Sequence, residues 1–163
     1  MNLYKYQCSS RWCLFLWFYY NKGDLVLSNS GTWYNHTAAS AGSSLGMSSG
    51  TAPDSICPLG WMLPTYDNDK SYDKLITKVY GRTNTGNDRD TALLHLPFSL
   101  LRSGYYNYSS ASRYNRNSRG GYWESRFSST ADSYYLSFYS TYLNPKYTYY
   151  RGGGLSVRCV SRS

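Results

Sequence analysis

Hydrophobic positions follow a helical period most clearly in Ser71–Tyr80. Its apolar side chains recur at the i, i+3, i+4 and i+7 spacing of one helix face: Tyr72, Leu75, Ile76 and Val79. Ser71 is suited to cap the first turn, and Gly81 is suited to end the last one. The segment therefore predicts a helix with that face buried and its charged residues in solvent: Asp73, Lys74 and Lys78.

A period of two predicts strands in the second half of the chain. In Ser133–Tyr139, Tyr134, Leu136 and Phe138 alternate with Tyr135, Ser137 and Tyr139. Gly121–Trp123 predicts another short strand. Gly152–Val160 predicts a terminal core strand, with Leu155, Val157 and Cys159 on one face and Ser156 and Arg158 on the other.

The remaining apolar segments are short. Trp12–Tyr20 has nine residues, too few to cross a bilayer, and no small-residue cleavage site follows it directly, so we expect a buried strand rather than a secretion signal. Asp24–Ser28 and Thr32–Tyr34 are strand-like. Thr91–Leu101, interrupted by Pro97, predicts a short helix or turn and then a strand around Phe98–Arg102, with His95 as a structural histidine.

A helix-bearing first half followed by short antiparallel strands and long loops favours an α+β fold. The length of 163 residues fits a single domain, with residues 1–30 the least certain part. The side chains that we assign to its core are Trp61, Leu75, Ile76, Trp123, Tyr135, Leu136, Phe138 and Val157.

Gly104–Arg151 has a distinct composition. It consists largely of Tyr, Ser, Asn, Arg, Gly and Thr, and holds twelve of the 20 tyrosines. Disordered segments are depleted in aromatic residues, whereas Tyr, Ser, Gly and Asn with Arg anchors are typical of binding loops on rigid scaffolds. We therefore interpret residues 104–151 as a recognition surface.

The net charge of +8 is concentrated in the same half. Residues 1–99 carry eight Lys and Arg against seven acidic residues, and residues 100–163 carry nine against two. A basic, aromatic surface could bind nucleic acid, an acidic protein or a glycan. A solvated basic face without a specific partner is the alternative.

The sequence contains few groups suited to catalysis or metal binding. It has no phosphate-binding loop, no His-Glu-x-x-His and no Gly-x-Ser-x-Gly, and its two histidines are His36 and His95. Cys8, Cys13, Cys57 and Cys159 form no Cys-x-x-Cys motif and allow three disulfide pairings. Asn35-His36-Thr37 matches the short glycosylation acceptor pattern. We expect no enzyme activity, no cofactor and no metal site.

Several motifs resemble one family in their order. DSICPLGWMLPT is followed by a helix, SGYYN, GYW, SST, YYLSF, NP and a Gly-rich turn into LSVRC. Over about Gly31 to Arg162 this resembles C-type-lectin-fold domains of the formylglycine-generating-enzyme and "major paralogous domain" group. The usual run of tryptophan, two serines and threonine is interrupted here by residues 124–127. The resemblance implies that Cys57 and Cys159 lie close enough to form a disulfide; two buried free thiols are the alternative.

Domains of this kind are similar to the variable proteins of diversity-generating retroelements, in which template adenines are randomised. Randomising the first two bases of Asn codons cannot produce Lys, Glu, Gln, Met or Trp. Within 104–151 those types supply only Trp123, Glu124 and Lys146. The resemblance implies a variable, non-catalytic receptor or adhesin on a cell or virion surface or outside the cell, with a protein or glycan ligand.

An invariant adhesion domain of the same fold is the second hypothesis, and a nucleic-acid binder is the third. Calcium-dependent sugar binding is not expected, because Leu143-Asn144-Pro145 lacks the acidic ligand of the lectin motifs. The side chains expected to face the ligand are Tyr106, Tyr108, Arg113, Tyr114, Asn115, Arg116, Asn117, Arg119, Tyr122, Arg126, Tyr142, Tyr147, Tyr149 and Arg151.

Overall fold

The computed structural model describes residues 32–65, 69–81, 93–95 and 98–162, so the strands expected at Trp12–Tyr20 and Asp24–Ser28 lie outside it. Two helices and eight strands follow one another along the described chain: α1 (His36–Ala39), β1 (Gly50–Thr51), β2 (Trp61–Met62), α2 (Tyr72–Tyr80), β3 (Tyr105–Asn107), β4 (Ser112–Tyr114), β5 (Arg119–Phe127), β6 (Asp132–Tyr139), β7 (Tyr142–Tyr150) and β8 (Val160–Ser161). The fold is α+β with antiparallel sheets, as the sequence predicts.

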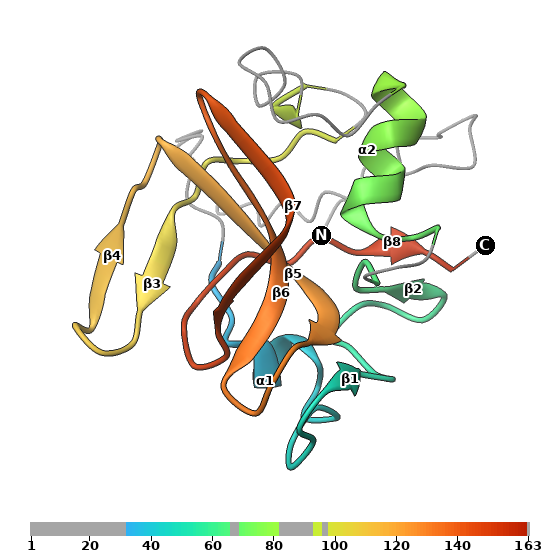
Figure 1. The fold of residues 1–163 in the computed structure, drawn as a ribbon, viewed down its shortest axis with the longest axis vertical. Coiled ribbons are helices and arrows are strands. Elements are labelled where there is room, and N and C mark those ends of the chain that lie inside the picture. The colour runs from blue at the N-terminus through green and yellow to red at the C-terminus, as the bar shows by residue number, and fades with distance from the viewer. Residues whose placement is uncertain (1–31, 66–68, 82–92, 96–97, 163) are drawn as a thin grey trace, which may run out of the picture.

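A four-stranded sheet in the order β1-β5-β6-β7 forms the centre, and β2-β8 and β3-β4 form two smaller ribbons. The β3–β4 ribbon and helix α2 lie on opposite sides of the central strands (Figure 1). The strands predicted at Gly121–Trp123 and Ser133–Tyr139 are confirmed within β5 and β6.

Helix α2 packs against one face of this sheet. Its Leu75 and Ile76 join Tyr122, Leu136 and Phe138 in one buried cluster. The predicted caps are confirmed: Ser71 Oγ accepts from Lys74 N at 3.2 Å, and Gly81 ends the helix in the left-handed conformation at φ 76°.

Two predictions for this helix need correction. Val79 was expected on the buried face but is exposed, because it lies in the last turn, beyond the contacts with the sheet. Asp73 does not point only to solvent, since its carboxylate lies 3.6 Å from Lys146 Nζ on β7.

The second buried cluster lies on the other face of the sheet, around Trp123, Tyr135 and Leu155. The core assignment is confirmed for Leu75, Ile76, Trp123, Tyr135, Leu136 and Phe138, whereas Trp61 and Val157 are only half-buried. Trp123 Nε1 donates to the Tyr34 carbonyl at 2.7 Å, which satisfies the polar group of this buried indole.

Two predicted strands are not formed as expected. In Phe98–Arg102, side chains satisfy the backbone instead of a neighbouring strand: Tyr122 Oη accepts from Leu101 N at 2.7 Å, and Arg158 Nη2 donates to the Phe98 carbonyl at 2.9 Å. His95 is exposed rather than structural.

Gly152–Val160 does not form the predicted continuous strand. Single bridges join Gly154 to Tyr106, Leu155 to Tyr34 and Ser156 to Tyr122, and only Val160 belongs to β8. The backbone of this segment bonds to three different neighbours in turn, so its side chains do not alternate between core and solvent as predicted. Ser156 and Arg158, which were expected on the face opposite Leu155, Val157 and Cys159, are both buried.

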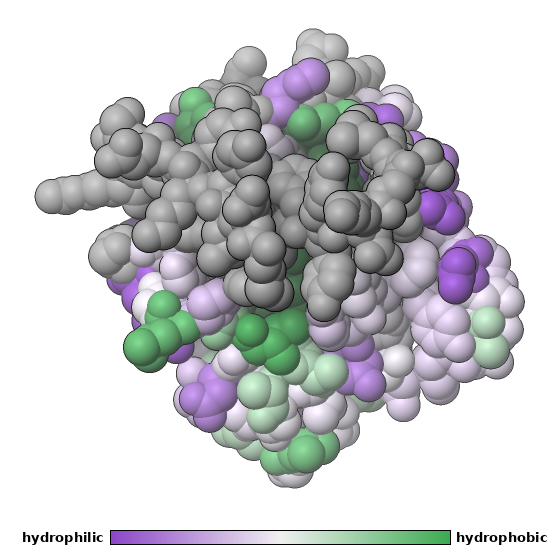
Figure 2. Space-filling model, turned by 180° about the vertical axis from the view of Figure 1, so that it is seen from behind, coloured by the Kyte–Doolittle hydropathy of each residue, from purple (hydrophilic) through white to green (hydrophobic). Residues whose placement is uncertain are grey.

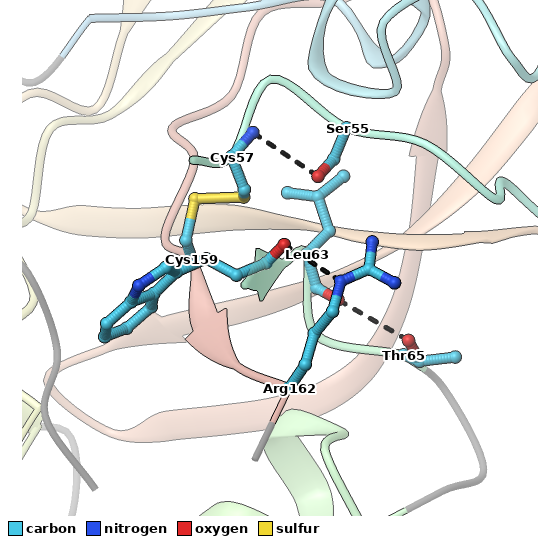
Figure 3. Close-up of a disulfide and its surroundings, with 7 residues drawn as sticks. Ser55, Cys57, Leu63, Thr65, Cys159 and Arg162 are labelled. Atoms are coloured by element: carbon cyan, nitrogen blue, oxygen red, sulfur yellow. Dashed lines mark hydrogen bonds between the residues drawn. A yellow bond between two sulfur atoms is a disulfide. The ribbon is translucent and has the colours of Figure 1, made fainter. Parts of the chain in front are cut away.

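The disulfide expected from the family resemblance is present between Cys57 and Cys159, with Cα atoms 5.8 Å apart (Figure 3). It connects the segment before β2 to the segment before β8, and those two strands pair with each other. The bond closes a loop spanning 102 residues, which stabilises the fold by about 4–5 kcal/mol in the chain-entropy model.

The surface of the described chain mixes polar and apolar groups. On the rear face, hydrophobic residues form separate groups among hydrophilic ones (Figure 2). Large exposed apolar side chains include Leu45, Met47, Ile56 and Leu59. Within the described ranges, none of the helices has the length and apolar content needed to cross a membrane.

His36 gives the fold a specific pH dependence. It is buried edge-on to Trp123, and its Nε2 donates to the Glu124 carbonyl at 3.0 Å, while Nδ1 is buried without a hydrogen bond. Burial lowers the pKa of His36 from 6.5 to about 4, against the raising effect of that hydrogen bond and with a smaller lowering effect of Arg151.

Because the unfolded chain binds this proton more readily, the stabilisation should be complete above pH 6.5 and lost between pH 6.5 and 4, by up to about 3 kcal/mol. Urea unfolding at several pH values measures the loss. His36→Gln should flatten the slope over this interval, and His95→Gln, which alters an exposed histidine, should not. An unchanged slope in His36→Gln would contradict the assignment.

Candidate functional site

The sheet face opposite α2 carries a group of tyrosines around one arginine. Neighbouring residues of a strand point to opposite faces, so Tyr122 faces α2 while Arg119 and Trp123 face the other way. Across β5 and β6, Arg119 lies opposite Tyr139, and Trp123 lies opposite Tyr135. We call this group the tyrosine face; its members are Tyr105, Arg119, Tyr135, Tyr139, Tyr142, Tyr147 and Tyr149.

An irregularity between β6 and β7 brings more tyrosines to this face. Tyr135 pairs with Tyr147 but Ser137 pairs with Asn144, so β7 has one extra residue in this interval. In a regular strand Tyr142 and Tyr147, five positions apart, would point to opposite faces, and the bulge brings them to the same face. Pro145 lies in the interval and has no N–H for the ladder, which suits it to a bulge.

The rings of the tyrosine face contact one another continuously. Tyr135 and Tyr147 meet edge to face with centroids 5.6 Å apart, and Tyr139 and Tyr142 stack at 4.9 Å. Tyr149 meets Tyr105 at 5.6 Å and Tyr135 at 6.0 Å. Such offset and edge-on contacts stabilise aromatic pairs beyond their area burial, so each ring fixes its neighbour.

Arg119 is held at the centre of this face by its hydrogen bonds. Its Nη2 donates to Tyr135 Oη and to Ser137 Oγ, both at 2.9 Å, and its Nε donates to Ser137 Oγ at 3.2 Å. The guanidinium carbon also lies 5.8–5.9 Å from the ring centroids of Tyr105, Tyr139 and Tyr147. Cation–π attraction therefore adds to the hydrogen bonds in orienting the charge.

A cavity of about 240 Å³ opens among these side chains. Its lining consists of Tyr105, Arg119, Tyr135, Tyr147, Tyr149 and Leu155. Gly121 forms part of its support, because a Cβ there would lie 2.8 Å from Leu155 Cδ2. The walls are thus aromatic and apolar, with one cation and several phenol groups.

Burial favours the neutral form of two phenols at this site, Tyr135 and Tyr149. Burial raises the pKa of Tyr135 to about 12, although the Arg119 charge acts to lower it. Burial also raises the pKa of Tyr149. Neutral phenols and a guanidinium offer hydrogen-bond donors and aromatic surface, which suits binding more than proton transfer.

The β3–β4 ribbon extends the tyrosine face and holds many of the predicted ligand residues. Arg113, Tyr114, Asn115, Arg116 and Asn117 are exposed on it or just after it. Tyr114 stacks on Tyr105 at 5.6 Å, and Arg113 lies over Trp33 at 5.5 Å.

The remaining predicted ligand residues are spread more widely. Tyr108 is exposed and stacks on Tyr150 at 4.2 Å, while Tyr106 is half-buried and bridges Gly154 through its backbone. Arg126 lies at the other end of β5, in register with Thr51.

Two predicted ligand residues face the interior instead. Tyr122 is buried against α2, and its hydroxyl donates to the Leu101 carbonyl at 3.2 Å. Arg151 is buried over the Phe127 ring, and its guanidinium donates to the carbonyls of Ser44 and Met47. Both are structural, because their polar atoms are needed by backbone groups of neighbouring loops.

Sequence reasoning missed three tyrosines of this surface: Tyr105 and Tyr139 on the tyrosine face, and Tyr150 beside it. It also assigned Tyr135 to the core alone, although the buried ring lines the cavity. The alternation Tyr135/Ser137/Tyr139 was the available signal, since it put Tyr139 on the same face as Tyr135.

Within the ranges that the structure covers, no three His, Cys, Asp or Glu side chains gather as a metal site would require. Comparison with protein-family models, curated proteins and solved structures gives no match.

Glycines keep the tyrosine face in place. A Cβ atom at Gly153 would overlap the Tyr149 ring, and a Cβ atom at Gly154 would lie 2.8 Å from Tyr106 Cβ. In Gly153→Ala we expect the Tyr149 ring to turn away, with a loss of stability of about 1 kcal/mol or less because a side chain rather than the backbone moves.

The measurement is the NMR shift of the Tyr149 and Trp123 rings together with the free energy of unfolding. A double-mutant cycle is the control: Gly153→Ala should have little effect on the Trp123 signals when Tyr149 is already Ala. Unmoved ring signals in Gly153→Ala would show that the close approach has no positioning role.

Proposed function

We propose that this protein is a non-catalytic ligand-binding module that grips a macromolecular ligand, foremost a protein, through the tyrosine face. The observation that carries the proposal is the ordered set of tyrosine rings around one oriented guanidinium, on the sheet face opposite α2. Tyr and Arg are the residue types enriched at interface hot spots. Tyrosine also loses little conformational entropy on binding, because it has two side-chain torsions.

The exposure of the face supports this role. Tyr139 and Tyr147 are 37% and 42% exposed, and Tyr114 on the neighbouring ribbon is 41% exposed. Tyr147 nevertheless packs edge-on against the buried Tyr135, and Tyr139 and Tyr114 stack on the half-buried Tyr142 and Tyr105. A surface that is accessible and already ordered pays less entropy on association than flexible loops do.

We further propose that the frame is a C-type lectin fold of the kind used by variable proteins of diversity-generating retroelements. The pairing of β2 with β8 brings together the two segments that carry the clearest family motifs, and the Cys57–Cys159 bond joins them. Trp123 and Glu124, two of the three residues in 104–151 that randomised Asn codons cannot produce, are fully buried. Both facts fit a constant frame under a varied surface.

Sister copies of the gene test this diversification. Their differences should gather at accessible positions such as Arg113, Asn115, Tyr139 and Tyr147, while Trp123 and Glu124 stay constant. Sequencing the locus should also find a near-identical template repeat with adenines at the varied positions, close to a reverse transcriptase. Uniform drift over the domain would instead favour an invariant adhesion protein of the same fold.

Binding itself is tested by selecting phage-displayed random peptides on the immobilised full chain. Tyr139→Ala or Tyr147→Ala should weaken the selected peptides by more than tenfold, about 1.4 kcal/mol, because each removes an exposed aromatic anchor. Leu59→Ala, an exposed site before β2, is the matched control and should have no effect. If no peptide is selected, or an oligonucleotide binds with steep salt dependence, the protein-binding function is wrong.

A further inference from the structure

The Arg119 side chain carries a charge that no carboxylate in the described part of the chain neutralises. Among the described residues, no carboxylate pairs with it. Residues 100–163 contain two acidic residues, and both lie elsewhere. Glu124 is buried and accepts from Tyr72 N at 3.1 Å, at the start of α2. Asp132 lies at the far end of β6, in register with Tyr150 of β7. The cation is therefore set among aromatic rings and hydroxyls rather than beside an anion.

The orientation of the guanidinium leaves one side available. Ser137 Oγ accepts from Nε and Nη2, and Tyr135 Oη also accepts from Nη2. Nη1 donates to no described residue. The hydroxyls of Tyr105, Tyr147 and Tyr149 likewise have no hydrogen-bond partner among the described residues, and these three tyrosines line the same cavity as Arg119. The cavity thus combines a fixed cation with donor groups that no described residue occupies.

We propose that this cavity receives one carboxylate side chain, Asp or Glu, of a protein partner; the inference rests on the proposed binding function and specifies its ligand. The carboxylate would accept from Arg119 Nη1 and from a neighbouring phenol, as charge-assisted hydrogen bonds. The aromatic walls would contact the methylene groups of the inserted side chain.

The size and charge of the cavity favour this occupant. Its volume of about 240 Å³ is below the range of about 300–1,000 Å³ that is common for small-molecule sites, and suits a single side chain. One guanidinium lines it, whereas a nucleic-acid backbone is held by several cations that each contact a phosphate. The excess of nine basic over two acidic residues in 100–163 would also attract an acidic partner.

The test uses the same phage-displayed peptides on the full chain. Peptides selected by the wild type should be enriched in Asp or Glu at one position, and Glu→Gln or Asp→Asn at that position should weaken them at least tenfold. Arg119→Gln should remove the acidic preference. Arg162→Gln is the matched control, since it deletes one positive charge at an exposed residue that donates to the Trp61 carbonyl in β2.

The outcomes separate this inference from the proposed function. Peptides that bind the tyrosine face without an acidic residue, or acidic peptides that bind Arg119→Gln equally well, would overturn the carboxylate assignment and leave the binding function standing. A selection that yields no peptide would overturn both. The peptide-side substitutions decide the matter even if Arg119→Gln fails to fold.

Discussion

The two-sidedness of the β5–β6–β7 sheet is the constraint on which the rest of the structure depends. Adjacent residues Tyr122 and Trp123 point to opposite faces, and so do Leu136 and Tyr135. One face buries aliphatic and aromatic side chains against α2, which provides much of the hydrophobic stabilisation. The other face can then carry phenols and a guanidinium, because the buried cluster on the α2 side does not depend on those side chains.

The tyrosine face is ordered mainly by polar and aromatic contacts. Arg119 links Ser137 and Tyr135 by hydrogen bonds while its charge lies near three further rings. Edge-on contacts extend this order from Tyr135 to Tyr147 and Tyr142, and Tyr139 stacks on Tyr142. A ligand would meet a surface whose conformation is set before it arrives, which lowers the entropic cost of binding.

Close packing beneath the face limits which residues could vary without loss of the fold. Gly153 leaves room for the Tyr149 ring, and Gly154 leaves room for the Tyr106 side chain. Trp123 is fixed by its hydrogen bond to the Tyr34 carbonyl. Arg113 and Tyr114 on the β3–β4 ribbon are exposed, so side chains there can change without displacing a buried neighbour. A frame of this kind can tolerate changes at its surface while its buried residues stay the same, whether or not the gene is diversified.

The sequence alone determined the features that depend on local periodicity and composition: the α2 helix with Ser71 and Gly81 at its ends, the β6 alternation, the α+β class and the concentration of tyrosine and arginine in 104–151. The tertiary structure decided which of those side chains share a surface. Tyr122 and Arg151 point inward, where their polar atoms donate to carbonyls of residues far away in the chain. The bulge in β7 places Tyr142 and Tyr147 on the same face. Such outcomes depend on strand register and on contacts between residues far apart in the chain, which no local pattern encodes.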